Sequence, residues 1–127
     1  FVAGHPIEKP ETIATAIRIG KPASWDLAVA ARDDSGGLID AVTDDQILDA
    51  YRILADKEGF FVEPSSAASV AGLLQQASRG LVDAGSTIVC TVTGNGLKDT
   101  QWALESAKDP VVVPVDVKAA AAELGLA

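Results

Sequence analysis

The sequence predicts an α/β fold, part of a three-layer α/β/α domain with a mainly parallel sheet. Residues 87–92 are rich in Ile, Val and Thr without polar alternation, which is typical of a central parallel strand covered on both faces. Short apolar runs also alternate with helical patterns long enough to serve as crossovers between parallel strands. Because the four short strands expected below make only a thin sheet, we expect the chain to be an incomplete part of such a domain.

The composition is that of one globular domain. The 127 residues are 48% hydrophobic and 22% charged, and no apolar run approaches the roughly 18 residues that cross a bilayer. The start lacks a signal-peptide pattern, so we expect a cytoplasmic protein with no membrane partner. A formal charge of −8, with 10 basic residues scattered among 18 acids, disfavours nucleic acid as a partner. The chain opens at Phe1 and contains no Met, so we expect a piece of a longer protein.

Metal and disulfide chemistry find little support in the sequence. Cys90 is the only cysteine, which excludes an intrachain disulfide, and its apolar surroundings predict a small buried side chain. His5 is the only histidine, so the spacing of a metal site is absent. We therefore expect no metal.

The first third of the chain predicts two short helices and a strand. Residues 12–19 form a helical pattern ended by Gly20, although their β-branched side chains weaken it. A second helix is expected over residues 23–31, followed by a turn at 33–37. Residues 38–42 are then a brief strand.

The clearest helix signal begins at residue 43. Thr43 and Gln46 have the spacing of a capping box, in which a hydroxyl and an amide satisfy the first backbone N–H groups. An apolar stripe follows on one helix face, and Gly59 marks the end. The stripe consists of Ile47, Leu48, Tyr51 and Leu54.

The central part repeats strand, polar turn and helix. Residues 60–62 are a short strand, a polar turn follows at 63–69, and a helix is expected over 70–82 with a stop near Gly85. The strand at 87–92 comes next.

The C-terminal part predicts a helix over 97–107 that is broken at Asp109 and Pro110. Residues 111–115 are a strand that Pro114 confines to an edge or terminal position. Asp116 then caps a weak, alanine-rich final helix.

Two polar turns stand where parallel sheets bind ligands, at the carboxyl ends of strands, and we expect them to be close in space. Thr93 ends one strand, and its hydroxyl either binds a cofactor ring or anion or caps the next helix. Glu63 ends another, where it presents a carboxylate to a site or, as the simpler interpretation, fills a polar strand end. Residues 94–99 lack the spacing of a phosphate-binding P-loop, and we expect Lys98 to face solvent.

Three segments carry a family resemblance: residues 10–25 (PETIATAIRIGKPASW), 63–69 (EPSSAAS) and 91–99 (TVTGNGLKD). In order and spacing they resemble the threonine synthases, pyridoxal-phosphate-dependent enzymes of fold type II, the tryptophan synthase β-like family. The resemblance covers nearly the whole chain. The middle motif is shared more widely, with threonine dehydratase and serine racemase.

The resemblance implies a function for the longer protein. Threonine synthases convert O-phospho-L-homoserine and water to L-threonine and phosphate by β,γ-replacement, with pyridoxal phosphate as the electron sink. Thr93 matches the cofactor-binding residue whose hydroxyl meets the pyridine nitrogen. No catalytic residue is carried over, and Arg18 and Glu63 match segments near the cofactor without an assigned duty.

The resemblance also implies what lies elsewhere. The family's Schiff-base lysine, its glycine-rich phosphate loop and an asparagine facing the ring hydroxyl all precede the matched region. Residues 1–127 would thus be the C-terminal part of the pyridoxal-phosphate-binding large domain, inactive alone, and the full-length enzyme a homodimer.

Two alternatives remain open at this point. One is a part of a threonine or serine dehydratase, although those enzymes usually carry Ser-Gly-Gly/Ala-Asn where residues 93–99 read Thr-Gly-Asn-Gly-Leu-Lys-Asp. The other is a stand-alone α/β binding module.

Overall fold

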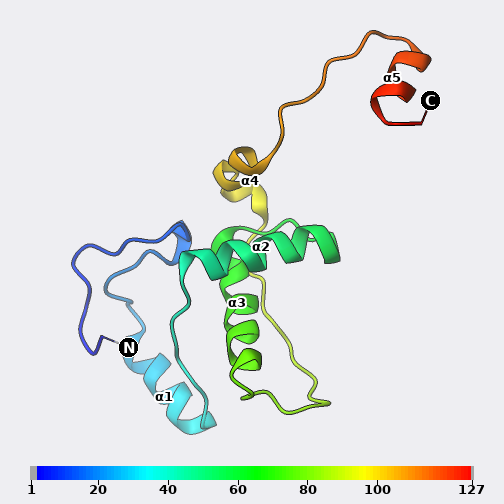
Figure 1. The fold of residues 1–127 in the computed structure, drawn as a ribbon. Helices are drawn as coiled ribbons and strands as arrows, with labels where there is room; N and C mark the ends of the chain where they lie inside the picture. The colour runs from blue at the N-terminus through cyan, green and yellow to red at the C-terminus, as the bar shows by residue number, and fades with distance from the viewer. Residues whose placement is uncertain (1–2, 127) are drawn as a thin grey trace.

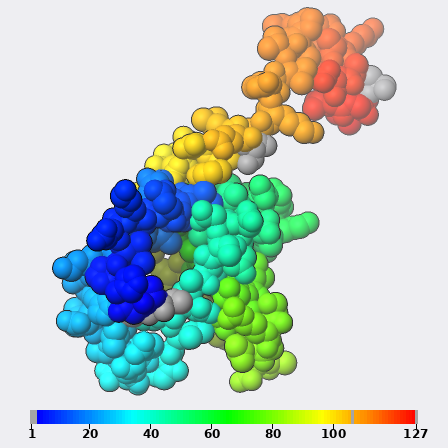
Figure 2. Space-filling model, turned by 60° about the vertical axis from the view of Figure 1, so that its left-hand side comes forward, coloured from blue at the N-terminus to red at the C-terminus, as the bar shows by residue number. Residues whose placement is uncertain are grey.

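The structure, a computed structural model, describes residues 3–126 and is built on two helices that cross. Helices α2 (Asp44–Glu58) and α3 (Pro64–Ser78) pack on each other (Figure 1). The short 3₁₀ turn η1 (Thr15–Ile17) contacts α3. The remaining elements are α1 (Trp25–Ser35), the 3₁₀ turn η2 (Gly96–Lys98), α4 (Gln101–Ser106) and α5 (Val117–Glu123). The segment leading to α5 projects from the body of the molecule (Figure 2).

The core lies between α2 and α3. Its side chains are Ala50 and three members of the predicted stripe of α2, the small residues of α3 that face them, and Val62 and Ala14 from the neighbouring loops. Leu48, the fourth member of the predicted stripe, is only half-buried and lies outside the core. Three of the core residues on the two helices are alanines, Ala50, Ala67 and Ala71, whose small side chains permit a short distance between packed helices. The buried members are Ala14, Ile47, Ala50, Tyr51, Leu54, Val62, Ala67 and Ala71.

Helix α2 begins and ends as the sequence predicts. The Thr43 hydroxyl accepts a hydrogen bond from the Gln46 N–H at 3.2 Å, and the Gln46 side chain accepts one from the Thr43 N–H at 2.8 Å. This reciprocal capping box satisfies two N–H groups that the helix leaves free. At the other end Gly59 adopts the left-handed conformation with φ of 71°. The predicted cap of α5 is also confirmed, since an Asp116 carboxylate oxygen accepts from the Ala119 N–H at 2.9 Å.

The expected sheet is not formed within residues 3–126. Residues 38–42, 87–92 and 111–115 contain no strand, and 60–62 contribute only one antiparallel bridge, between Val62 and Asn95. The prediction that 87–92 is covered on both faces is wrong for the part described, because Val89 is 86% exposed. The physical reason is that a strand needs hydrogen-bonding neighbours, and no other described segment offers its backbone to residues 87–92. Cys90 is half-buried there rather than buried.

Several helix boundaries differ from the predictions. Residues 12–19 form only the turn η1, because the Thr12 hydroxyl and the Ile13 N–H bind the Asp44 carboxylate instead of continuing a helix. Helix α1 continues into the expected turn at 33–37 and ends at Ser35, with Gly36 as its C-terminal cap at φ of 64°.

The later helices also shift. Helix α3 starts at Pro64, within the expected polar turn, because proline suits a first helical position, where no N–H partner is needed. It ends at Ser78, before the expected stop near Gly85. The single helix expected over 97–107 is split into η2 and α4, with Asp99 extended between them at φ of −148°.

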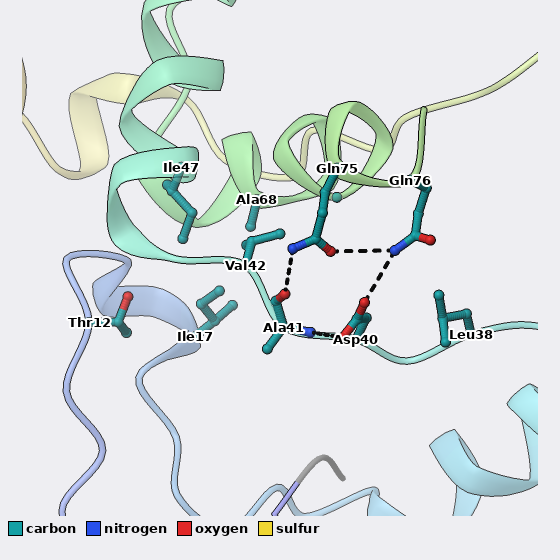
Figure 3. Close-up of a pocket in the computed structure, with 11 residues that line it drawn as sticks. Thr12, Ile17, Leu38, Asp40, Ala41, Val42, Ile47, Ala68, Gln75 and Gln76 are labelled. Carbon is teal, nitrogen blue, oxygen red and sulfur yellow. Dashed lines mark hydrogen bonds between the residues drawn. The ribbon is translucent and has the colours of Figure 1, made fainter. Parts of the chain in front are cut away.

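Side chains of α3 hold the extended segment 38–42 in place (Figure 3). Gln75 donates to the Ala41 carbonyl at 3.2 Å, and Gln76 donates to the Asp40 carboxylate at 3.2 Å. Arg79 pairs with the same carboxylate at 2.9 Å. Between this segment, η1 and the two crossing helices lies a cavity of about 500 Å³. The Ala41 N–H, and then Arg79 and Gln76, hold the pKa of Asp40 below its ordinary value of 3.8.

Replacing Thr43 by Ala should lower the free energy of unfolding of the α2–α3 core by about 1 kcal/mol, because the Gln46 N–H loses its acceptor. Urea unfolding followed by circular dichroism measures the change. Asp116→Ala is the matched control: it removes the cap of a helix that lies apart from the core, and should leave the main transition unchanged. Equal losses in the two variants would contradict the role of the capping box.

The Asp40 contact should depend on pH in one direction. The pKa of Asp40 in the folded state lies below 3.8, so ionised Asp40 stabilises the fold above about pH 3.8. This stabilisation is lost as the pH falls through the folded-state pKa. A carbon-13 NMR titration of the Asp40 carboxyl should show that pKa rising toward 3.8 in Arg79→Ala. Arg52→Ala, which removes the cation beside Asp49, should leave the Asp40 titration unchanged.

Candidate functional site

The start of α3 and the turn at residues 93–96 are joined by backbone hydrogen bonds. The Glu63 N–H donates to the Gly94 carbonyl at 3.0 Å, and the Gly96 N–H donates to the Phe61 carbonyl at 3.0 Å. The prediction that the two polar turns lie close together is therefore confirmed.

Ser66 fixes this turn from the first turn of α3. Its side chain is buried, with 2% of the residue exposed, and its hydroxyl accepts a hydrogen bond from the Gly94 N–H at 2.7 Å. The same hydroxyl oxygen lies 3.3 Å from Oγ1 of Thr93. Sequence reasoning assigned Ser66 no role, and the only signal was the group of serines directly after Glu63 and Pro64.

Thr93 stands at the end of the extended segment and is exposed. It borders a hollow of about 370 Å³ lined by residues 59–62 and 92–95. The alternative that Thr93 caps the following helix is wrong, because the Asn95 side chain is the group that accepts from the Leu97 N–H, at 2.9 Å. Thr93 thus lines the hollow, and its hydroxyl lies beside that of Ser66.

Glu63 lies buried behind the turn. Its side chain is 5% exposed, and one carboxylate oxygen is 3.5 Å from Nζ of Lys98, whose own side chain is 62% exposed. The carboxylate packs directly on Gly94, where a Cβ would collide with it. Glu63 therefore supports the turn from within, and Lys98 faces solvent, as predicted, while pairing with it.

The glycines of the turn are required by close contacts. A Cβ at Gly96 would lie 2.5 Å from the Phe61 ring. Phe61 in turn packs edge-on against Tyr51 of α2, with ring centroids 6.4 Å apart and an interplanar angle of 68°. Burial, and secondarily the charge of Asp99, raise the pKa of Tyr51 above 10.0. The turn is thereby connected to the core.

The first of the three motif segments also reaches this region. The Thr15 hydroxyl of η1 donates to the Asp99 carboxylate at 2.9 Å, which connects residues 84 positions apart in the chain. The Thr12 hydroxyl donates to Asp44 of α2 at 2.5 Å. The three motifs, separate in sequence, therefore converge around the crossing of α2 and α3.

The polar groups at the turn can be compared with what a metal ion or a cofactor ring would need. Within residues 3–126, no three His, Cys, Asp or Glu side chains gather as metal ligands would. Thr93, one of the residues that line the hollow, carries a hydroxyl that can donate to a ring nitrogen, which is the chemistry that one edge of a pyridine cofactor needs. As for membranes, the described helices include none with the length and apolar character of a transmembrane span.

Comparisons with known proteins agree with the motifs. A family model described as "Pyridoxal-phosphate dependent enzyme" matches residues 1–94. The chain is 56% identical to the threonine synthase of Mycobacterium leprae over 126 residues, covering 99% of this chain and 35% of the relative. The threonine synthase of Mycobacterium tuberculosis H37Rv is 56% identical over 127 residues, covering 100% and 35%.

A relative of lower sequence identity is also a threonine synthase. The threonine synthase of Methanocaldococcus jannaschii is 47% identical over 112 residues, covering 88% of this chain and 28% of the relative. The resemblance predicted from the three motifs is confirmed. The chain spans about a third of the length of the mycobacterial relatives, at 35%.

Replacing Gly96 by Ala should lower the free energy of unfolding by about 1–3 kcal/mol, because the added methyl group displaces the Phe61 ring. Gly72→Ala is the matched control. It lies inside α3 with open space where the Cβ would go, and should be neutral or stabilise the helix by up to about 1 kcal/mol. Urea unfolding of both variants measures the difference. A Gly96→Ala protein as stable as Gly72→Ala would contradict the close contact.

Proposed function

The chain belongs to the family of pyridoxal-phosphate-dependent enzymes, and we propose that it is the C-terminal part of a threonine synthase. The proposed reaction of the whole protein converts O-phospho-L-homoserine and water to L-threonine and phosphate. Identity of 56% to curated threonine synthases along the full length of this chain supports it. The dehydratase alternative is not favoured by any contact in the structure.

We propose that residues 1–127 form the C-terminal part of the cofactor-binding large domain. In the longer protein, the extended segment 87–92 would join a mainly parallel sheet whose other strands lie outside this chain. Its exposed side chains support this, with Ile88 46% and Val89 86% exposed. The apolar groove of about 750 Å³ beside it is available for covering elements.

The observation that carries the proposal is the placement of Thr93. Thr93 borders the hollow, and the backbone of its turn is held to the start of α3. Pyridoxal phosphate, when bound, supplies an electron sink for β,γ-replacement. Thr93 would hold the pyridine nitrogen by a hydrogen bond. Because a neutral hydroxyl does not force a proton onto that nitrogen, as a carboxylate would, the ring stays a milder electron sink.

The lysine that binds the cofactor covalently is proposed to lie outside these 127 residues. Lys98, the lysine nearest the turn, is already paired with the buried Glu63 carboxylate at 3.5 Å. The chain alone is therefore expected to be inactive. A homodimeric full-length enzyme is part of the proposal and rests on the resemblance alone.

In the full-length protein, Thr93→Ala should lower kcat for O-phospho-L-homoserine about tenfold or more, because the ring nitrogen loses its partner. Thr93→Asp should also impair turnover, because a carboxylate favours the protonated ring nitrogen. Phosphate release measures turnover, and thermal unfolding verifies that the fold is intact.

Thr91→Ala is the matched control, since Thr91 lies on the same segment but lines the apolar groove instead of the hollow. The kcat of Thr91→Ala should stay within about twofold of wild type. A change that small is less than the loss of one hydrogen bond would cause. The 127-residue chain alone should release no phosphate above background. Unchanged turnover in both Thr93 variants would defeat the role proposed for Thr93.

A further inference from the structure

Ser66 and Thr93 form a hydroxyl pair whose hydrogen-bond direction can be derived from burial. A serine hydroxyl has one proton to donate and two lone pairs that accept. The Gly94 N–H already donates to Ser66 Oγ at 2.7 Å, and Thr93 Oγ1 lies 3.3 Å away on another side. Geometry alone allows either hydroxyl of the pair to be the donor.

Burial separates the two directions. If Thr93 donated to Ser66, the Ser66 proton would be left without an acceptor in a residue that is only 2% exposed. An unsatisfied buried donor costs about 1–3 kcal/mol. If Ser66 donates to Thr93, every polar atom of Ser66 is satisfied, and the Thr93 proton turns to the exposed side, where solvent or a ligand accepts it. The second direction is therefore the more stable one.

We propose that Ser66 is a positioning residue that makes Thr93 a hydrogen-bond donor toward the hollow. In this arrangement the Gly94 N–H donates to Ser66, the Ser66 hydroxyl donates to Thr93, and the Thr93 hydroxyl donates to a group in the hollow. Such a site accepts a ring nitrogen that carries a lone pair and disfavours one that carries a proton. This inference rests on the proposed function and adds the residue that sets the polarity of the Thr93 contact.

Hydrogen bonds within the first turns of α3 fix the backbone position of Ser66. The Ser66 N–H donates to the Glu63 carbonyl at 3.0 Å, and the Ser66 carbonyl accepts from the Ser69 hydroxyl at 3.0 Å. The neighbouring Ser65 hydroxyl is buried too, yet within the described residues it has no hydrogen-bond partner. Ser65→Ala is thus a matched control: the same change, one residue away, with no hydrogen bond lost.

The first test uses the full-length protein without cofactor. Three-bond NMR couplings of the Thr93 side chain should report a single χ1 rotamer in wild type and in Ser65→Ala. In Ser66→Ala they should average over several rotamers, and the Gly94 N–H should exchange faster with solvent. An averaged Thr93 rotamer in wild type would overturn the proposal without any variant, so the test does not depend on whether Ser66→Ala folds.

The second test uses the protein loaded with pyridoxal phosphate labelled with nitrogen-15 in the ring. In wild type and Ser65→Ala, the ring nitrogen should resonate as an unprotonated, hydrogen-bonded nitrogen. In Ser66→Ala the resonance should move toward that of a free nitrogen, and kcat should fall about tenfold at unchanged KM. A protonated ring nitrogen in wild type, or an unchanged resonance in Ser66→Ala, would overturn the role of Ser66.

Thr93→Ala separates this inference from the proposed function. If Thr93→Ala changes the nitrogen resonance and Ser66→Ala does not, Thr93 binds the ring and only the positioning role of Ser66 is wrong. If neither variant changes the resonance or turnover, the Thr93 contact itself is wrong, and the inference falls with it.

Discussion

The hydrogen bond from the Gly94 N–H to the buried Ser66 hydroxyl is the contact on which the geometry of the site depends. At 2.7 Å it ties the turn at residues 93–96 to the first turn of α3. The turn can approach this closely only because Gly94 has no Cβ, since the Glu63 carboxylate fills that space. Thr93 precedes Gly94, so its position at the edge of the hollow follows from this contact.

A second constraint, the need of every backbone N–H and C=O for a partner, explains why the sheet is missing. Residues 87–92 have the β-branched composition of a buried strand, but the described chain offers them no neighbouring strand. Helices α2 and α3 satisfy most of their own backbone groups and bury their apolar faces against each other, with Ala14 and Val62 completing the core. Under the proposed function, the segment that ends at Thr93 is completed by strands from the rest of the enzyme.

Features governed by local chemistry could be predicted from the sequence, and those governed by distant partners could not. The capping box at Thr43, the stop at Gly59 and the cap at Asp116 depend on neighbours within one helical turn, and all three are present. The helix expected over 12–19 does not form because the Thr12 hydroxyl binds Asp44, 32 positions further along the chain. The role of Ser66 was missed for the same reason, because its partner is 28 positions away. For Thr93, the local sequence fits a helix cap as well as a cofactor contact, and only the family motif at residues 91–99 favours the contact.

The central claim is that the Thr93 hydroxyl, held by Ser66, meets the pyridine nitrogen of the cofactor. A crystal structure of the full-length protein with pyridoxal phosphate tests it most directly, through the distance from Thr93 Oγ1 to the ring nitrogen. We predict a distance of about 2.6–3.2 Å, with Ser66 Oγ still within hydrogen-bond reach of Thr93. A ring nitrogen bound by a carboxylate, or more than about 4 Å from Thr93, would contradict it.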